Sequence, residues 1–396
     1  MDVPEITVDW RSKGFWLPDG ARTAAELARE RPGLFDGLLT WPVLVLRRAA
    51  AEANIATMAA YCRRHGWDFA PHAKTTMAPG LLAAQLDAGA WGMTVATANQ
   101  ALVLRRLGVR RILIANQVLD PVALRWLAGE PDIWFQVDSV AGVKAAADAG
   151  GESRVLVEFG HPGGRTGVRT LDELVSVARA TVAAEGVELA GVTAYEGQLK
   201  TEQEVDDFLD LFVAGVTRLQ EEGLLPAQPI VSAGGSAWFD RVTERLAPIK
   251  NARLVLRSGA SVTHDDGFYR ERTPFLRVPA EGPLAAALEI WAQVTSTPEP
   301  GLALAGMGKR DAPFDEGLPV PMEIRRADGS SAPVGGVEVT KLNDHHTYLS
   351  TGEAALTPGD LIRFGISHPC TAFDKWRHIP VIDEDRRVVD VLETYF

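Results

Sequence analysis

The chain has 396 residues and a formal net charge of −12, with 46% hydrophobic and 23% charged residues. This size predicts one large domain plus a smaller one, and no apolar run approaches the roughly 20 residues of a membrane helix. The negative net charge and the absence of clusters of Lys and Arg argue against a nucleic-acid-binding protein and favour a small-molecule ligand. The first residues lack a basic stretch followed by an apolar one, so we expect a cytoplasmic protein.

Three segments are expected along the chain. Residues 1–46 form an N-terminal segment that ends in a short strand at 42–46 and is expected to join a β domain. Residues 47–276 begin with an amphipathic helix and then alternate short apolar runs with Ala- and Leu-rich helical stretches. Residues 277–396 are expected to form the β domain, because Pro, Gly and Asp separate short strands there.

The regular alternation of apolar runs and helical stretches in residues 47–276 predicts a parallel barrel. Apolar runs of about five residues that alternate with helical stretches are typical of βα repeats around a parallel sheet. Eight repeats in roughly 200 residues match a closed barrel, whereas a doubly wound open sheet usually has fewer strands. We predict an α/β fold, a (β/α)8 TIM-type barrel with a second, mostly β domain. The eight runs are 68–73, 92–96, 111–115, 133–137, 154–159, 189–195, 229–232 and 254–256.

The first barrel run delivers His72 and Lys74 at its C-terminal end. In a parallel barrel that end of the strands forms the ligand crevice. A lysine there is either a phosphate clamp or a covalent nucleophile. The alternative is an ordinary solvated lysine on a loop.

Two loops rich in Gly and Ser, 232–236 and 257–261, follow the last two barrel runs, where barrels most often bind phosphate. Glycine lets backbone N–H groups approach an anion, and serine hydroxyls add donors. Each loop alone is typical of a turn. Together, opposite a strand-end lysine, they indicate a phosphorylated cofactor held covalently by Lys74. Pyridoxal 5′-phosphate (PLP) fits, because it needs a Schiff-base lysine, a phosphate cup and a partner for its ring nitrogen.

Four motifs in this chain resemble those of the alanine-racemase-type (fold type III) PLP enzymes. The resemblance is greatest for the branch that holds D-serine dehydratase, D-threonine aldolase and bacterial D-amino-acid deaminases, and it runs from about residue 40 to the end. It implies a cofactor-carrying barrel, a β domain that closes over it, and a homodimer. The motifs are Pro71-His72-Ala73-Lys74-Thr75, Gly164-Arg165-Thr166-Gly167, Tyr195-Glu196-Gly197 and residues 232–236.

The resemblance also implies roles for single residues. Lys74 is the catalytic Schiff-base lysine, Arg165 contacts the ring nitrogen, and Tyr195 lies beside the cofactor. An arginine at the ring nitrogen does not give up its proton, so the pyridine stays largely unprotonated and is a weaker electron sink. The remaining cofactor-binding residues are expected to be His72, Ser232, Gly234, Gly235 and Ser236.

A metal ion is expected to assist the bond breaking, because the unprotonated pyridine ring is a weaker electron sink. His368 and Cys370 are two residues apart, so an extended segment puts imidazole and thiol on one side, as a two-ligand clip for Zn²⁺. The alternative is a packed cysteine beside a surface histidine. The resemblance adds that dehydratases of this branch carry His-x-Cys here, and aldolases His-x-Asp. We expect Zn²⁺, with Mn²⁺ or Mg²⁺ as alternatives, acting as a Lewis acid on a β-hydroxyl group.

Thr76 and Gln198 stand where members of the family carry histidine, and the second of those histidines lies near the metal in relatives. The surroundings of the metal are therefore expected to differ here. Three other histidines are weaker candidates. His346 is expected in a β turn, with the site as the alternative. His264, in the segment His264-Asp265-Asp266, is expected in a solvated polar loop, with a contact to substrate or to a partner subunit as the alternative. His161 lies in a loop after a barrel strand.

The leading hypothesis is a D-serine dehydratase-like lyase. Lys74 would remove the α-proton of a small D-β-hydroxy amino acid, the β-hydroxyl would leave, and the products would be a 2-oxo acid and ammonia. The alternative is a D-threonine aldolase-like cleavage that gives glycine and an aldehyde. A racemase would need a second base that the sequence does not assign, and a single-barrel regulatory protein would lack the roughly 120 residues after Phe275.

Overall fold

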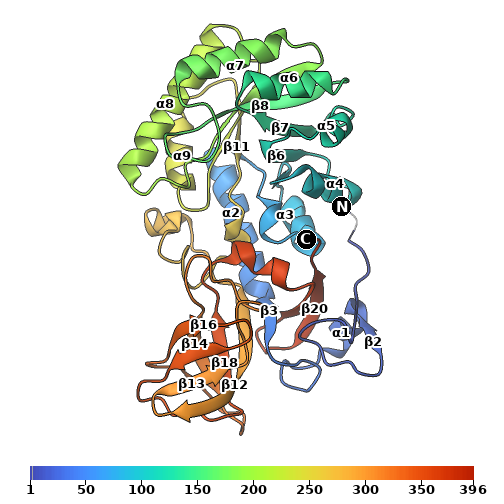
Figure 1. The fold of residues 1–396 in the computed structure, drawn as a ribbon, viewed down its shortest axis with the longest axis vertical. Coiled ribbons are helices and arrows are strands. Elements are labelled where there is room, and N and C mark those ends of the chain that lie inside the picture. Colours follow the sequence, from blue (N-terminus) through green and yellow to red (C-terminus); the bar gives the residue numbers. More distant parts are fainter. Residues whose placement is uncertain (2) are drawn as a thin grey trace.

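The computed structural model describes Met1 and residues 3–396 as a parallel barrel stacked on a β domain (Figure 1). All pairs in the barrel sheet are parallel, in the order β4-β11-β10-β9-β8-β7-β6-β5. A parallel bridge from His72 to Thr94 joins the two ends of this order. The predicted fold class is confirmed. The strands are β4 (Asp68–Phe69), β5 (Met93–Val95), β6 (Ile112–Gln117), β7 (Ile133–Val137), β8 (Ser153–Phe159), β9 (Val187–Ala194), β10 (Ile230–Ala233) and β11 (Arg253–Leu256).

Helices cover the outside of the barrel, and local sequence signals set their starts. Helices α7 (Leu171–Ala183) and α8 (Glu202–Glu221) each begin with a capping box, Thr170 with Glu173 and Thr201 with Glu204. None of the helices in the described part of the chain is long and apolar enough to cross a membrane. The other barrel helices are α2 (Arg48–His65), α3 (Pro79–Asp87), α4 (Ala98–Arg106), α5 (Pro121–Leu127), α6 (Val140–Asp148) and α9 (Phe239–Leu246).

The second domain is built on a ten-stranded sheet that includes one strand from the N-terminal segment. Strand β3 (Val43–Arg47) pairs antiparallel with β12 (Leu288–Glu299) and parallel with β19 (His378–Ile382). The remaining strands of this sheet are β13 (Leu302–Ala305), β14 (Val320–Arg325), β15 (Ser331–Pro333), β16 (Glu338–Leu342), β17 (Thr347–Ser350), β18 (Leu361–Gly365) and β20 (Val388–Glu393). The N-terminal segment adds β1 (Thr7–Asp9), β2 (Ala21–Thr23) and α1 (Ala24–Glu30).

The two domains meet at the C-terminal end of the barrel strands. After β11 the chain runs alongside the segment that precedes His368: Asp266 N donates to Ile366 O (3.0 Å) and Phe268 N to Ser367 O (2.8 Å). The C-terminal residues also reach the barrel, since Tyr395 N donates to Met77 O (3.0 Å). These contacts bring the turn at 368–371 to the mouth of the barrel.

Candidate active site

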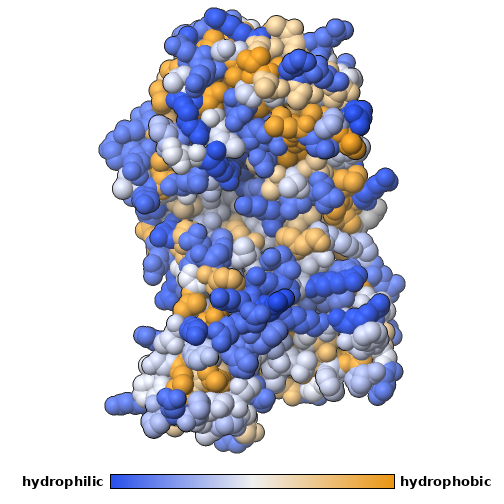
Figure 2. Space-filling view, in the orientation of Figure 1, coloured by the Kyte–Doolittle hydropathy of each residue, from blue (hydrophilic) through white to orange (hydrophobic). Residues whose placement is uncertain are grey.

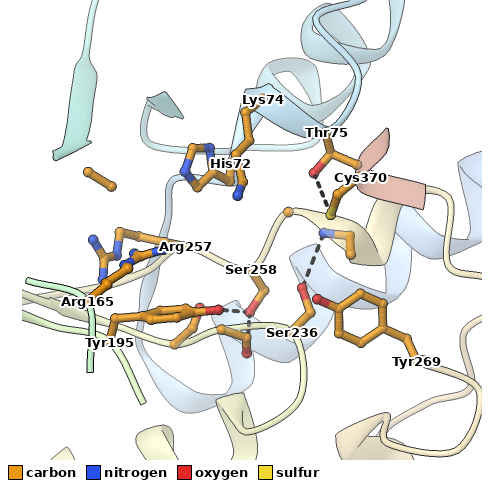
Figure 3. Close-up of a pocket in the computed structure, with 15 residues that line it drawn as sticks. His72, Lys74, Thr75, Arg165, Tyr195, Ser236, Arg257, Ser258, Tyr269 and Cys370 are labelled. Atoms are coloured by element: carbon orange, nitrogen blue, oxygen red, sulfur yellow. Dashed lines mark hydrogen bonds between the residues drawn. The ribbon is translucent and has the colours of Figure 1, made fainter. Parts of the chain in front are cut away.

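An open cleft of about 520 Å³ lies at this mouth, lined by residues from both domains (Figure 3). It brings together eight of the residues predicted from sequence and adds others. The lining residues are His72, Lys74, Thr75, Ala115, Arg165, Tyr195, Gly234, Gly235, Ser236, Arg257, Ser258, Gly259, Ala260, Tyr269 and Cys370.

Lys74 lies in a single 3-10 turn, η1 (Ala73–Thr75), directly after β4. The turn is closed by Thr76 N and Met77 N, which both donate to Ala73 O (3.0 and 2.8 Å), and Pro79 then starts α3 at a position that needs no N–H partner. The lysine side chain lines the cleft (Figure 3). The amine predicted to be the nucleophile is therefore at the site.

His72 lies between Lys74 and the arginines of the cleft (Figure 3). Its Nδ1 atom is buried and has no hydrogen-bond partner in the described structure. Burial, and after it the charges of Lys74 and Arg257, lower the pKa of His72 well below its usual range. The imidazole is neutral at pH 7 and offers a free ring nitrogen.

Arg257, at the end of β11, is a site residue to which the sequence analysis assigned no role. It is 6% exposed, and its Nη2 donates to Ala194 O, while Nε and Nη1 are buried without partners. Burial lowers the pKa of Arg257 to about 10, so it remains a cation. Unpartnered N–H groups on a buried guanidinium are costly and indicate a missing ligand. The feature of the sequence that could have identified Arg257 is its position at the end of a barrel strand, where the predicted 257–261 loop begins.

Arg165 and Tyr195 form a stacked pair in the same wall. The guanidinium carbon lies 4.1 Å from the centre of the Tyr195 ring. The backbone N–H of Arg165 donates to the side-chain oxygen of Gln198 (3.2 Å). Gln198, one of the two departures from the family, thus holds the loop that carries Arg165. Burial raises the pKa of Tyr195, so its phenol is protonated.

The loop after β10 is built as a rigid cradle, but its first two N–H groups have an internal partner. Gly234 N and Gly235 N donate to the buried carboxylate of Glu196 (3.2 and 2.5 Å), whose pKa is raised by burial. Gly234 has φ +100°, which favours glycine. Ser258 Oγ donates to the carbonyls of both glycines (3.1 and 3.2 Å). The loop is therefore held in place before any ligand arrives.

Ser232 is a correction to the predicted cradle. It lies within β10, is fully buried, and its hydroxyl donates to Val255 O (2.9 Å) on the neighbouring strand. It is not among the residues that line the cleft. Ser236, by contrast, lines the cleft, and its Oγ accepts from Ala260 N (3.2 Å).

Replacing Gly235 with leucine is expected to weaken cofactor binding more than folding. A Cβ atom there would lie 3.1 Å from Tyr195 Cε2 and 3.2 Å from Glu196 Oε1, inside the cleft wall. Overpacking of this kind costs about 1–3 kcal/mol. If the leucine side chain avoids the clash by turning into the cleft, the cost falls on cofactor binding instead of folding, as a loss of roughly 5- to 150-fold in affinity. Titrating PLP into the apoprotein measures it, with Gly335→Leu as control, since a Cβ there meets nothing within 4 Å. Unchanged affinity would place the phosphate away from this loop.

Of the predicted metal pair, Cys370 lies on the far side of the cleft from Tyr195 (Figure 3), and His368 is not among the residues that line the cleft. Cys370 lines the cleft, with its Sγ 3.8 Å from Thr75 Oγ1. The imidazole of His368 lies beside Cys370 and 2.8 Å, by its Nδ1, from Asp315 Oδ2. Burial disfavours the imidazolium, but Cys370 and Asp315 outweigh it and raise the pKa of His368 to about 9. The described residues contain no group of three or more His, Cys, Asp and Glu side chains around one point.

This donor set offers a metal two protein ligands. A thiol and an imidazole are ligands that Zn²⁺ accepts, but catalytic zinc sites commonly have three protein ligands, so a metal here would need water or substrate at its remaining positions. The carboxylate of Asp315 is hydrogen-bonded to Nδ1 of His368, as carboxylates commonly are beside metal-binding histidines.

The segment after β11 differs from its prediction. His264 and Asp265 are 5% and 1% exposed, so the solvated loop expected there is wrong. Asp265 Oδ1 accepts from the N–H groups of Gly267, Tyr269 and Arg270 (2.9, 2.9 and 3.3 Å), which folds the segment tightly. The folded segment places Tyr269 in the cleft wall, and this residue too was not predicted from the sequence.

The remaining histidine candidates lie elsewhere. His346 is exposed in the turn between β16 and β17, where its carbonyl accepts from Asn343 N (2.9 Å), as expected for a β turn. His161 packs its ring edge-on against Phe208, with 5.4 Å between ring centres, and does not line the cleft.

The residues present fit PLP. Lys74 supplies the amine for the aldehyde, Arg257 has two unpartnered donors, and the backbone at Gly235 approaches without a side chain. The charges of Lys74, Arg165 and Arg257 suit a phosphorylated, anionic ligand.

Two family models match the chain in order. The alanine racemase, N-terminal domain, matches residues 46–251. The putative serine dehydratase domain matches residues 287–382. The first covers the barrel up to the residues before β11, and the second covers most of the β domain.

Curated relatives and solved structures match over nearly the same span. A 3-hydroxy-D-aspartate aldolase of Paracoccus denitrificans (strain Pd 1222) is 28% identical over 85% of this chain and 87% of its own. A D-threonine aldolase of Arthrobacter sp. is 27% identical over 96% of each chain. The structure of D-threo-3-hydroxyaspartate dehydratase from Delftia sp. HT23 superposes with a TM-score of 0.73 at 24% identity, covering 90% of this chain and 98% of that one.

Proposed function

The chain belongs to the family of the alanine racemase N-terminal domain, and on this basis we propose that it is a PLP-dependent lyase of D-β-hydroxy amino acids. The proposed reaction converts a substrate of the D-serine type into a 2-oxo acid and ammonia. The observation that carries the proposal is that Lys74 and Cys370, an amine and a soft metal ligand, line one cleft.

Lys74 is the proposed catalytic base. PLP, when bound at this lysine, supplies an electron sink for the bond that breaks at Cα. Lys74 Nζ then takes the α-proton of the substrate, because no other amine lines the described cleft. Arg165 and Arg257 are both candidates for the ring nitrogen, and either would keep the pyridine unprotonated.

His368 and Cys370 are the proposed metal ligands. Zn²⁺ at this pair would act as a Lewis acid toward the β-hydroxyl group, which is a poor leaving group on its own. Thiolate is a soft ligand that favours Zn²⁺ over Mn²⁺ or Mg²⁺. This preference supports elimination, in which the C–O bond breaks, over cleavage of Cα–Cβ.

The alternative function is a D-threonine aldolase-like cleavage. It is supported by the similarity to the aldolases of Paracoccus denitrificans and Arthrobacter sp. described above. Tyr269, with its phenol beside Ser236 and a pKa raised by burial, would serve as a proton donor rather than as a base. Tyr269 is therefore not the base that removal of the β-hydroxyl proton would require.

A product assay separates the two reactions. Purified protein with PLP and Zn²⁺ is expected to release ammonia and pyruvate from D-serine and ammonia and 2-oxobutanoate from D-threonine. Glycine and acetaldehyde from D-threonine, without ammonia, would establish the aldolase instead. L-Serine serves as the control for stereochemistry.

We further propose a cytoplasmic homodimer, as the resemblance implies. Trp10 and Trp16, 72% and 64% exposed, are large apolar side chains of the N-terminal segment that a second copy could cover. Sedimentation velocity measures the assembly state.

A further inference from the structure

We propose that Asp315 is a positioning residue that holds both proposed metal ligands through one carboxylate. The inference rests on the metal role of His368 and Cys370 in the proposed function. It concerns a residue of the β domain that lies outside the cleft wall.

The carboxylate of Asp315 contacts both ends of the turn that carries the ligands. Its Oδ2 lies 2.8 Å from His368 Nδ1, and its Oδ1 accepts from Thr371 Oγ1 at 2.8 Å. His368 precedes the 3-10 turn η5 (Pro369–Thr371), which is closed by Ala372 N donating to Pro369 O (3.1 Å). Cys370 lies between the two fixed points, so the carboxylate restrains the thiol as well as the imidazole.

The contact also decides which ring nitrogen is available. A carboxylate beside Nδ1 favours the tautomer that carries the proton on Nδ1. A metal would then displace any proton on Nε2 and take the lone pair of that nitrogen. A carboxylate in this place also raises the basicity of the ligand. Without Asp315 the ring has two tautomers and more rotational freedom.

The loop that carries Asp315 is anchored earlier in the chain, at Asp311. Asp311, 1% exposed, accepts from Gly308 N (2.9 Å) and is paired with Lys13 Nζ at 2.7 Å. Lys13 also lies 3.8 Å from the ring centre of Trp376, whose Nε1 donates to Asp311 O (2.9 Å). The N-terminal segment thus fixes the loop from which Asp315 reaches His368.

Asp315 adds little to folding by comparison. Its side chain is 40% exposed, and partly exposed ion pairs contribute little to stability. Removing it should therefore change the metal site while the fold and the cofactor site persist. This separation makes the proposal testable.

The experiment measures Zn²⁺ affinity of the PLP-loaded protein by competition with a chelator. Asp315→Ala is expected to weaken Zn²⁺ binding about 10- to 100-fold. Asp315→Asn is expected to lose less, because its amide oxygen still accepts from Nδ1–H. Glu316→Ala, which removes the next and exposed carboxylate of the same loop, is the control and should match the wild type. Cofactor absorbance and Tm are recorded for every variant.

A double-variant comparison shows whether Asp315 acts through His368. If it does, Asp315→Ala should add little further loss of Zn²⁺ affinity in a His368→Ala background. An equal loss in both backgrounds, or wild-type affinity in Asp315→Ala, overturns the proposal. Wild-type Zn²⁺ affinity in His368→Ala overturns the metal pair itself, and the positioning role with it, while the PLP-dependent reaction stays testable by its products.

Discussion

The Lys74→Ala variant is expected to be colourless and inactive. Lys74 is the only lysine among the described residues that line the cleft, so no other amine is placed to form a Schiff base with PLP. Loss of the general base alone lowers a rate by about 10²- to 10⁴-fold, and loss of the covalent attachment adds to this. The measurements are the visible absorbance after reconstitution with PLP and the rate of ammonia release.

Lys74→Arg separates the two roles that a strand-end lysine can have. Arginine keeps the positive charge but does not form the Schiff base under these conditions. A phosphate clamp would survive this change with much of its cofactor affinity and activity. A nucleophile would not, and we expect the variant to resemble Lys74→Ala. Lys144→Ala, at an exposed lysine paired only with Asp148, is the matched control.

Metal removal is expected to abolish elimination from D-serine while the PLP absorbance remains. The cofactor contacts come from the barrel and the metal pair from the β domain, so one can be lost without the other. His368→Ala is expected to lower the rate by orders of magnitude, because the metal supplies several kcal/mol toward departure of hydroxide. Zn²⁺ should restore the chelated wild type but not this variant.

A substrate with a better leaving group sharpens this test. β-Chloro-D-alanine loses chloride, which needs no Lewis acid, so its elimination should depend much less on Zn²⁺ than that of D-serine. Equal loss for both substrates would indicate that the metal holds the substrate or the fold rather than the leaving group. Full activity toward D-serine in metal-free protein would leave Cys370 as an ordinary thiol at the cleft.

Local patterns in the sequence were sufficient for the architecture. Each repeat of a short apolar run and a helical stretch spans about 30 residues. Its hydrophobic periodicity and its turn residues predict the strand and the helix, because both depend only on neighbouring residues. The same local order put Lys74 at the end of the first barrel strand and Cys370 two residues after His368.

The composition of the site depended on contacts between residues far apart in the chain. Asp315 meets His368 across 53 residues, and Arg257 reaches Ala194 O across 63. Ser232 belongs to a Ser/Gly loop by sequence, yet the strand extends through it and its hydroxyl turns to Val255. The sequence around Asp265 is typical of a solvated polar loop. The side chain is nevertheless buried, because hydrogen bonds from three backbone N–H groups replace those that it would make with water.

The sequence by itself determined the fold class, the family resemblance and the amine at the strand end, since each depends on residues adjacent in the chain. Tertiary structure decided which side chains share the cleft, because the direction of a side chain at a strand end follows from register and packing. It also decided the partners of polar groups such as Glu196, Arg257 and Asp315. Those partners are fixed by where distant segments meet, and no local pattern records that.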